Sequence, residues 1–428
     1  MSNRGTMFDW LITILLIIII IMSGGTIYLL NGIYQATFAA PATTKPTITV
    51  YALWTGQEEA NFRQVLGNFT HNTGINVSYY GYTTQDLLVG VPLQLKAPPY
   101  VVDVVIAPWP YWIMQLSSSY LESVNDVITA SQFPDSFINP VKDSSGNIWA
   151  APFKLSGKPG FWYRPSFFQA HGLTVPTTYQ QFTDTFLPAL KAVQGVEAAI
   201  ASGDTVGWPL SDTTEGFLMG LGGYQLQLDL ETGPSARNWT DPQARNPMGN
   251  LTQLLTDGYF STPAEWESQV AKLWSGKYGI YWQGSFITAL PEVQDVSDID
   301  FFGFPGTNGV SGSIDYAVIP KYAPHLAEAK QLVQYMSGAD AQTIMVGMGG
   351  FLGTNKGVSS SAYKPIDKKV IDFMGQAGMH VVPDLDDTIG GAWQTTFWTE
   401  LKLLWVQPNQ LNSVLNTLEN AAIQQQGG

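Results

Sequence analysis

The 428-residue chain contains no cysteine. This absence excludes disulfide bridges, thiolate metal sites, a cysteine nucleophile and a lipid-modified cysteine. Charge is also scarce: charged residues make up 13% of the chain, whereas soluble domains typically carry about 25%. The 20 basic residues are outnumbered by 34 acidic ones, and no run of four or more Lys or Arg occurs. We therefore expect no nucleic-acid partner, because phosphate binding needs concentrated positive charge.

Sequence signatures of common enzymes are missing as well. The patterns G-x-S-x-G, H-E-x-x-H and G-x-x-x-x-G-K-S/T do not occur, and the four histidines are scattered singly. We therefore expect no metal site, no cofactor and no covalent chemistry. Paired carboxylates could make a surface glycoside hydrolase, and among 34 acidic residues some pair always looks suitable. That alternative stays open.

The N-terminal part contains a long apolar run. Trp10–Leu30 is 21 residues without a charge, which as a helix spans about 31 Å and is long enough for a bilayer core. We predict that residues 1–30 form a signal or single-pass transmembrane anchor and that residues 31–46 form a linker. Arg4-Gly5-Thr6 resembles the short pre-pilin type of archaeal signal, whose cleavage leaves the apolar segment as an anchor.

The charges beside this run predict the orientation of the chain in the membrane. Arg4 and the α-amine flank the run on its N-terminal side, and the next positive charge is Lys45. This asymmetry predicts a cytoplasmic N-terminus and a body on the extracellular face of the cell membrane. Four glycosylation sequons are compatible with that location but do not establish it: Asn68, Asn76, Asn238 and Asn250.

Residues 47–107 carry the pattern of a β-α-β-α-β unit. Strands are predicted over residues 47–53, 75–80 and 101–107, with helices between them. Thr55 and Glu58 fit a capping box at the start of the first helix. Ligands bind beyond the carboxyl ends of the strands in such units, where residues 54–59 and 108–112 lie.

Several aromatic residues follow predicted strands or lie near a helix start. Trp54 and Trp109 follow the first and third strands, Trp282 ends a later one, and Trp393 and Trp398 lie near the start of a late helix. A flat aromatic face suits the apolar C–H face of a sugar ring, although a core position is the ordinary role of any one tryptophan. Acidic side chains would then bind the sugar hydroxyls, and the candidates are Glu58, Asp212, Glu215 and Asp315.

The order of segments resembles the extracellular solute-binding proteins of ABC importers, in the maltose and multiple-sugar group (family 1). The matching stretches include ITVYALWTGQEEANFRQVLGNF, VVDVVIAPWPYWIMQL, GNIWAAPFKLSGKPGFWYRPSFFQAHGLTVPTTYQQF, LWSGKYGIYWQGSF, GSIDYAVIPKY and TTFWTELKLLW. No single stretch is a strict motif, but their order and spacing extend over residues 47–428.

The resemblance implies an α/β, two-lobe fold of the periplasmic-binding-protein type (type II), with three segments crossing between the lobes and the ligand held between them. Crossings are expected near residues 149–155, 304–314 and 379–383. The expected boundaries are lobe 1 at residues 47–152 and 311–380, and lobe 2 at residues 153–310 and 381–428. The implied function is capture of a carbohydrate and its delivery to ABC permease subunits. A binding protein for another polar solute, such as a peptide or polyol, is the alternative within the same fold.

The resemblance also suggests ligand-binding positions. Trp109, Phe286 and Trp398 match aromatic positions of the family, and Asp212 to Glu215 match a loop that carries an acid and an aromatic. Gly157 falls where the maltose-binding relatives carry a ligand-binding Glu, and Phe286 stands for their Trp, which argues against maltose itself. The full set of candidate ligand-binding residues is Trp54, Glu58, Trp109, Tyr163, Asp212, Glu215, Trp282, Phe286, Asp315, Trp393 and Trp398.

Overall fold

The computed structural model describes residues 45–204 and 206–427, and the body that begins at Thr47 is one compact unit. The predicted anchor and nearly all of the predicted linker lie outside the described residues. Within the described residues, no helix is long and apolar enough to cross a membrane.

The larger sheet contains the predicted β-α-β-α-β unit. Strands β1 and β2 pair in parallel, as do β1 and β3, which confirms that unit. Among the described residues the sheet has eight strands, with the order β13-β5-β12-β3-β1-β2, and β4 and β14 also pair with β12. Its strands are β1 Thr47–Ala52, β2 Asn76–Gly81, β3 Val104–Ala107, β4 Leu121–Glu122, β5 Ala151–Lys158, β12 Gly309–Pro320, β13 Leu352–Gly353 and β14 His380–Pro383.

The first helix of this unit forms where predicted but is not capped as predicted. Helix α2 (Gly56–Thr73) buries its apolar stripe, including Phe62 and Phe69, in the core. The Thr55 side chain makes no capping hydrogen bond. Glu58 instead accepts a hydrogen bond from Lys154 at 2.8 Å, so the capping-box prediction is wrong because a buried ammonium outcompetes the helix terminus for this carboxylate.

A smaller sheet organises the second lobe. Its four described strands lie in the order β11-β6-β10-β7, and their bounds are β6 Gly160–Tyr163, β7 Ala198–Ala201, β10 Tyr278–Gln283 and β11 Asp300–Phe302. Successive residues alternate between two apolar clusters: Phe161 and Trp282 join one, and Trp162 and Tyr281 the other. Both faces of the sheet are therefore buried. Strands β8 (Gly203–Asp204) and β9 (Ala264–Glu265) form a short separate ladder.

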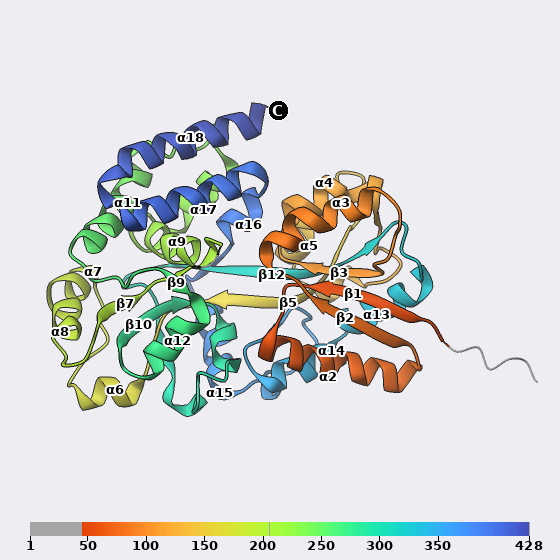
Figure 1. Cartoon of the computed structure of the whole chain (residues 1–428), viewed down its shortest axis with the longest axis horizontal. Helices are drawn as coiled ribbons and strands as arrows, with labels where there is room; N and C mark the ends of the chain where they lie inside the picture. The colour runs from red at the N-terminus through yellow and green to blue at the C-terminus, as the bar shows by residue number, and fades with distance from the viewer. Residues whose placement is uncertain (1–44, 205, 428) are drawn as a thin grey trace, which may run out of the picture. The chain divides into compact units, whose positions relative to one another are not determined.

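Helices surround each sheet (Figure 1). Around the larger sheet lie α2, α3 Val91–Lys96, α4 Pro110–Tyr120, α5 Asp135–Ile138, α13 Leu326–Ser337 and α14 Ala339–Met348. Around the smaller sheet lie α6 Pro165–Ala170, α7 Tyr179–Gln181, α8 Leu187–Lys191, α9 Trp208–Gly222, α10 Tyr224–Thr232, α11 Pro242–Thr256, α12 Trp266–Trp274, α16 Leu385–Ile389, α17 Gly391–Val406 and α18 Leu411–Gly427. Helix α15 (Pro365–Met374) packs beside β5.

Short irregular helices complete the described structure. The π-helical turns are η1 Asp86–Gly90 and η4 Phe182–Phe186; the 3₁₀ turns are η2 Ala130–Gln132, η3 Asn139–Val141, η5 Ser285–Ala289, η6 Val296–Asp298, η7 Ser360–Ala362 and η8 Pro408–Gln410. The helix predicted between the second and third strands thus consists of η1 followed by α3, with Pro92 in the first turn of α3.

Strands β5 and β12 run from one lobe to the other and pair antiparallel with each other (Figure 1). Strand β14 pairs in parallel with the beginning of β12. These strands overlap all three segments in which crossings were predicted. The exact lobe boundaries given above remain predictions.

Candidate functional site

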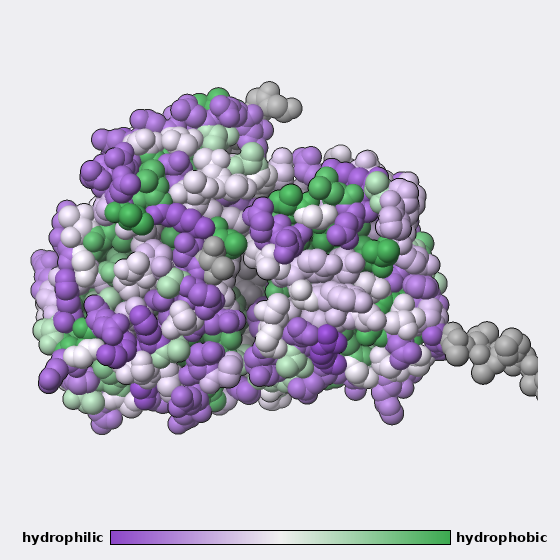
Figure 2. Space-filling model, in the orientation of Figure 1, coloured by the Kyte–Doolittle hydropathy of each residue, from purple (hydrophilic) through white to green (hydrophobic). Residues whose placement is uncertain are grey.

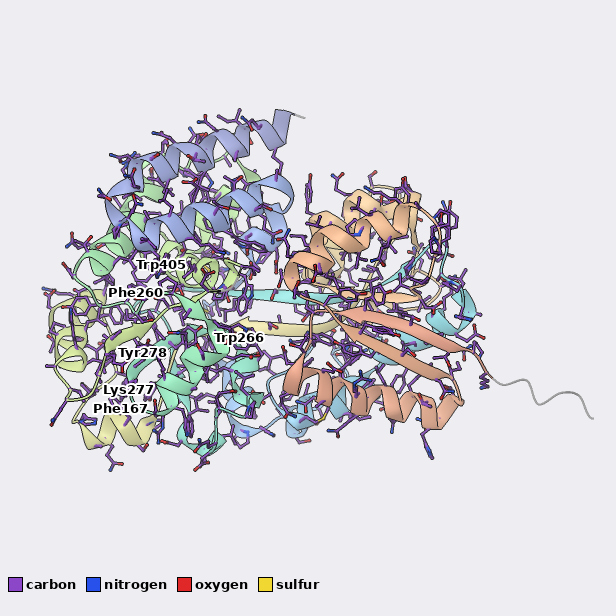
Figure 3. All side chains as sticks on the ribbon, in the orientation of Figure 1. Phe167, Phe260, Trp266, Lys277, Tyr278 and Trp405 are labelled. Carbon is purple, nitrogen blue, oxygen red and sulfur yellow. The ribbon has the colours of Figure 1, made fainter. Side chains whose placement is uncertain are left out.

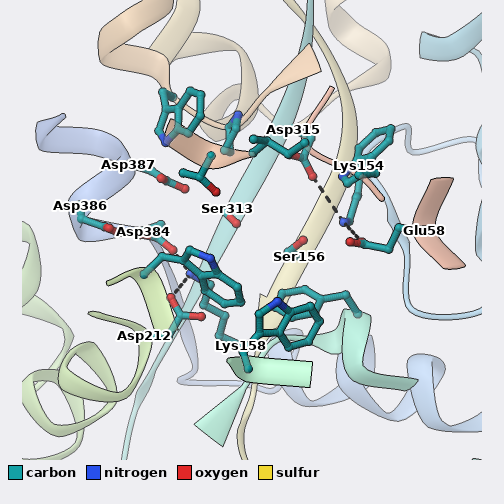
Figure 4. A pocket seen from close by; sticks show the side chains of 18 of the residues that line it. Glu58, Lys154, Ser156, Lys158, Asp212, Ser313, Asp315, Asp384, Asp386 and Asp387 are labelled. Atoms are coloured by element: carbon teal, nitrogen blue, oxygen red, sulfur yellow. Dashed lines mark hydrogen bonds and ion pairs between the residues drawn. The ribbon is translucent and has the colours of Figure 1, made fainter. Parts of the chain in front are cut away.

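A pocket of about 190 Å³ lies between the two lobes. The face shown in Figure 2 is hollowed between the lobes, and Figure 4 shows the pocket from close by. Its lining comes from the ends of β1 and β3, from the facing strands β5 and β12, from α9 and α12, and from the late segment that contains α16 and α17. The carboxyl ends of β1 and β3 therefore lie at a pocket, as predicted.

The pleat of β5 decides which of its side chains line the pocket. Lys154, Ser156 and Lys158 alternate along the strand, and all three line it. Gly157 faces the other side, where an added Cβ would lie 2.6 Å from the Met374 sulfur. A glutamate at position 157 could not reach the pocket, so the pocket-facing neighbours of that position are Ser156 and Lys158.

Lys154 holds together a first group of charges, which we call the Lys154 wall: Glu58, Lys154 and Asp315. The Lys154 ammonium lies 2.8 Å from Glu58 and 3.6 Å from Asp315, its partner across the strands (Figure 4). It also lies over the rings of Trp54, Phe286 and Phe351 at 4.3–5.7 Å. Burial acts to lower the pKa of Lys154, but Glu58 and Asp315 outweigh it and the pKa rises. The lysine is therefore a fixed cation in this wall.

A second group, the Lys158 wall, consists of Lys158, Asp212, Asp384, Asp386 and Asp387. Lys158 donates hydrogen bonds to Asp212 on α9 and to Asp384, which follows β14. Asp386 accepts a hydrogen bond from the indole of Trp398. One end of the pocket thus holds one ammonium among four carboxyl groups that line it (Figure 4).

The crowding of acids changes the proton affinities of the Lys158 wall. Burial raises the pKa of Asp212 to about 6, against the opposing effect of Lys158. Burial and the charge of Asp386 raise the pKa of Asp387 well above its usual range. Lys158 is itself held protonated, because the surrounding carboxylates outweigh the effect of burial and raise its pKa.

Three half-buried aromatic rings form a cluster at the pocket: Trp208, Trp266 and Phe286. Their centroids are 5.3–5.8 Å apart and their planes meet nearly edge to face. Trp266 is labelled in Figure 3. Because all three rings line the pocket while remaining partly exposed, this aromatic cluster offers apolar faces to a ligand.

The tryptophans predicted from the strand ends also line the pocket but are more deeply packed. Trp54 and Trp109 are 3% and 2% exposed, and Trp398 is 4% exposed. Trp54 contacts the rings of Phe62 and Phe351, so much of its surface belongs to the core of lobe 1. These residues combine a core role with a place at the pocket edge.

Seven of the predicted site residues line the pocket: Trp54, Glu58, Trp109, Asp212, Phe286, Asp315 and Trp398. Asp212 and Glu215 lie on helix α9 rather than in the expected loop, since Trp208-Pro209 begins a helix whose inner face is buried. Glu215 lies behind the pocket, where it accepts hydrogen bonds from Gln227 and from the Leu385 amide.

Three predicted aromatic residues lie elsewhere. Tyr163 packs on Phe168 and reaches Asp300 at 3.5 Å. Trp282 contacts Phe161 in the core of lobe 2, and Trp393 stacks on Phe397 and is fully buried. These three belong to the core or surface of lobe 2 and are not among the pocket-lining residues.

Several pocket-lining residues were not predicted from the sequence. The two lysines could have been found from the alternation K-x-S-x-K along β5, which puts three polar side chains on one face of a strand. The acids of the segment PDLDD could have been found as a local cluster. Trp208 and Trp266 carry no local signal that separates them from core tryptophans.

Comparisons with known proteins match the chain to a family. The model of the family described as "Bacterial extracellular solute-binding protein" matches residues 54–343. An uncharacterized ABC transporter extracellular-binding protein of Pyrococcus horikoshii is 39% identical, with 87% of each chain covered. The alpha-glucosides-binding periplasmic protein AglE of Rhizobium meliloti is 24% identical, with 82% of each covered. The solved structure of the bacterial solute receptor AcbH, described as having an exclusive preference for β-D-galactopyranose, is 20% identical, with a TM-score of 0.79, and the match covers 89% of this chain and 99% of AcbH.

Proposed function

Because this chain belongs to the family of bacterial extracellular solute-binding proteins, we propose that it captures a carbohydrate between its two lobes and delivers it to the permease of an ABC importer. The observation that carries the choice of ligand is the composition of the pocket. The aromatic cluster Trp208–Trp266–Phe286 offers apolar faces, while carboxylates and serines line the remaining surface. Sugars present both kinds of surface, an apolar C–H face and a rim of hydroxyls.

The sugars that two similar proteins are described as binding support the same ligand class. AglE is named for α-glucosides and AcbH is described as a receptor for β-D-galactopyranose. The chain covers most of the length of both proteins, so the comparison extends over both lobes and is not limited to a fragment.

A thermal-shift screen of the purified chain with mono- and oligosaccharides tests the ligand class. A sugar that binds the folded state raises the melting temperature, by mass action, in proportion to the logarithm of its concentration above Kd. We expect at least one sugar to do so, while peptides and acyclic polyols of similar size do not. A shift with peptides alone would contradict the proposal.

We also propose that the protein binds its sugar without converting it. The lysine-paired carboxylates of both walls are held in ion pairs, which suits hydrogen bonding to hydroxyls. A sugar recovered intact after prolonged incubation with the protein is the expected outcome. Release of a chromophore from an aryl glycoside would instead indicate a hydrolase.

We further propose that the Trp10–Leu30 segment anchors the body outside the cell membrane. The support is the uncharged 21-residue run and the lack of any cysteine for lipid attachment. The mature protein is expected in the membrane fraction. N-terminal sequencing of the mature chain that begins beyond Leu30 would exclude this anchor.

A further inference from the structure

The pocket carries more negative than positive charge. Seven of its lining residues are Asp or Glu and only two are basic, Lys154 and Lys158. The lining acids therefore outnumber the lining lysines by five, and three of them, Glu267, Asp386 and Asp387, form no ion pair with either lysine. A neutral sugar can satisfy hydrogen bonds of such groups, but it leaves the charge in place.

The excess is concentrated in the Lys158 wall. Lys158 pairs with Asp212 and Asp384, and no cation within ion-pair distance of Asp386 or Asp387 is found among the described residues. Their described side-chain partners are neutral: Asp386 accepts from the Trp398 indole, and Asp387 accepts from Gln394 at 3.4 Å. One carboxylate oxygen from each of Asp384, Asp386 and Asp387 lies within 4.8 Å of the other two.

Unpartnered buried atoms give an independent indication of a missing donor. Asp212 Oδ2 and Asp384 Oδ1 are buried and accept no hydrogen bond from any described residue. Both residues line the pocket and are at most 2% exposed. Buried acceptors without a donor are costly, so a ligand that donates here gains more than one that meets solvated groups. The raised pKa values of Asp212 and Asp387 are consistent with this shortage of positive charge.

We propose that the ligand is an amine-bearing saccharide whose ammonium group lies against Asp384, Asp386 and Asp387 while its ring contacts aromatic side chains of the pocket. This inference rests on the proposed function. Lys158 already donates to Asp212 and to one oxygen of Asp384, which leaves Asp384 Oδ1 as an acceptor for the ammonium group of the ligand. The indole of Trp398 beside Asp386 adds an aromatic surface, which favours an organic cation.

Matched pairs of sugars test the charge of the ligand. Calorimetric titration compares glucosamine with glucose, galactosamine with galactose, and short glucosamine oligosaccharides with the corresponding glucose oligosaccharides, at a pH where the amine is protonated. In the pair that binds, we expect the amine form to bind about 10- to 100-fold more tightly, the range typical of a hydrogen bond to a charged group. Raising the pH above the pKa of the sugar amine should remove the preference.

Substitutions locate the charge. Asp387→Asn should reduce the preference for the amine form by about tenfold, because it removes a carboxylate without changing side-chain size. Glu267→Gln removes an acid that lines the pocket from α12, and should reduce the preference less. Asp372→Asn, an exposed acid on α15 outside the pocket lining, is the matched control and should leave it unchanged. Melting temperatures of all variants verify that each is folded.

Each result has a distinct meaning. If neutral sugars bind and their amine forms bind no more tightly, the amine inference fails while the proposed function stands. If sugars of neither kind bind, the proposed function itself fails. Equal loss of preference in Asp387→Asn and Glu267→Gln would overturn the placement of the amine. Stabilisation by CaCl₂ or MgCl₂ alone that is lost in Asp387→Asn would assign the acids to a metal ion instead.

Discussion

The lysines of the two walls both lie on strand β5, but the carboxylates around them differ in number and in exposure to solvent. Lys154 meets two acids that keep some contact with solvent, since the side chains of Glu58 and Asp315 are 17% and 10% exposed. Lys158 meets Asp212 and Asp384, which are 1% and 2% exposed, with two further aspartates nearby. Water can reach the acids of the first wall. In the second wall Asp212, Asp384 and Asp386 are buried and only Asp387 is half-buried, so the charge of the buried aspartates is balanced by protons, by Lys158 or by a bound ligand.

The largest difference is expected when each lysine is removed. Lys158→Met leaves buried carboxylates without a partner and should lower the free energy of unfolding by about 3–5 kcal/mol near neutral pH. Lys154→Met should cost less, because Glu58 can turn toward solvent. Urea unfolding of both variants measures the difference, with the exposed Lys368→Met as a control whose expected change is under about 0.5 kcal/mol. Equal losses in Lys154→Met and Lys158→Met would refute the contrast between the walls.

Substitution of two tryptophans should distinguish a residue that packs in the core from one that contacts the ligand. Trp398 is 4% exposed and donates a hydrogen bond to Asp386, so Trp398→Ala should lower the free energy of unfolding by about 3–5 kcal/mol. Trp208, which is half-buried at the pocket, should cost much less stability. The Trp208→Ala variant should instead weaken sugar binding by about 5- to 150-fold, because a covered ring face contributes about 1–3 kcal/mol. Melting temperature and calorimetric affinity, measured on both variants, test this difference. A large loss of stability in Trp208→Ala together with a loss of affinity alone in Trp398→Ala would mean that the two rings have the opposite roles.

The pH dependence of stability should carry the signature of the buried acids. A carboxyl whose pKa is raised in the folded state contributes stability below its unfolded pKa and loses it as pH rises through the folded pKa. For Asp212 and Asp315, both raised to about 6, this window lies between about pH 4 and pH 6. These groups should therefore make the melting temperature higher at pH 5 than at pH 7. Replacing Asp387 by Asn should reduce that difference, and a wild-type protein that melts lower at pH 5 would argue against this balance.

The smallest predicted effect concerns two helix starts. The Thr178 side chain accepts a hydrogen bond from the Gln181 amide at 3.1 Å, whereas the Thr55 side chain caps nothing. Thr178→Ala should cost about 1 kcal/mol and Thr55→Ala clearly less, as measured by urea unfolding. An equal cost at both positions would indicate that Thr55 stabilises its helix in another way.

The sequence predicted the lobe 1 side of the pocket better than the other side. Trp54, Glu58 and Trp109 follow strands of a regular β-α-β-α-β unit, so their meeting at one sheet edge follows from topology. Trp208 lies at a helix start and has no local pattern that marks it as a pocket residue. Asp384 belongs to the acidic cluster PDLDD, which is visible in the sequence, but only tertiary packing brings that cluster to the pocket.

The local sequence also does not predict which individual aromatic side chains are buried. Trp282 ends a strand just as Trp54 follows one, yet it packs against Gly216 of α9 inside lobe 2. A sheet buried on both faces hides every side chain at such a position, whereas the edge of the larger sheet faces the pocket. The difference depends on which helices cover the strand, and sequence periodicity does not record it.

Hydrogen–deuterium exchange with and without a sugar found by the thermal-shift screen tests most directly whether the ligand lies between the lobes. A ligand held there should slow exchange on both sides of the pocket, near Trp54–Glu58 and Pro108 of lobe 1 and near Trp208 and Trp266 of lobe 2. Protection confined to one lobe, or to segments away from the pocket, would contradict the account.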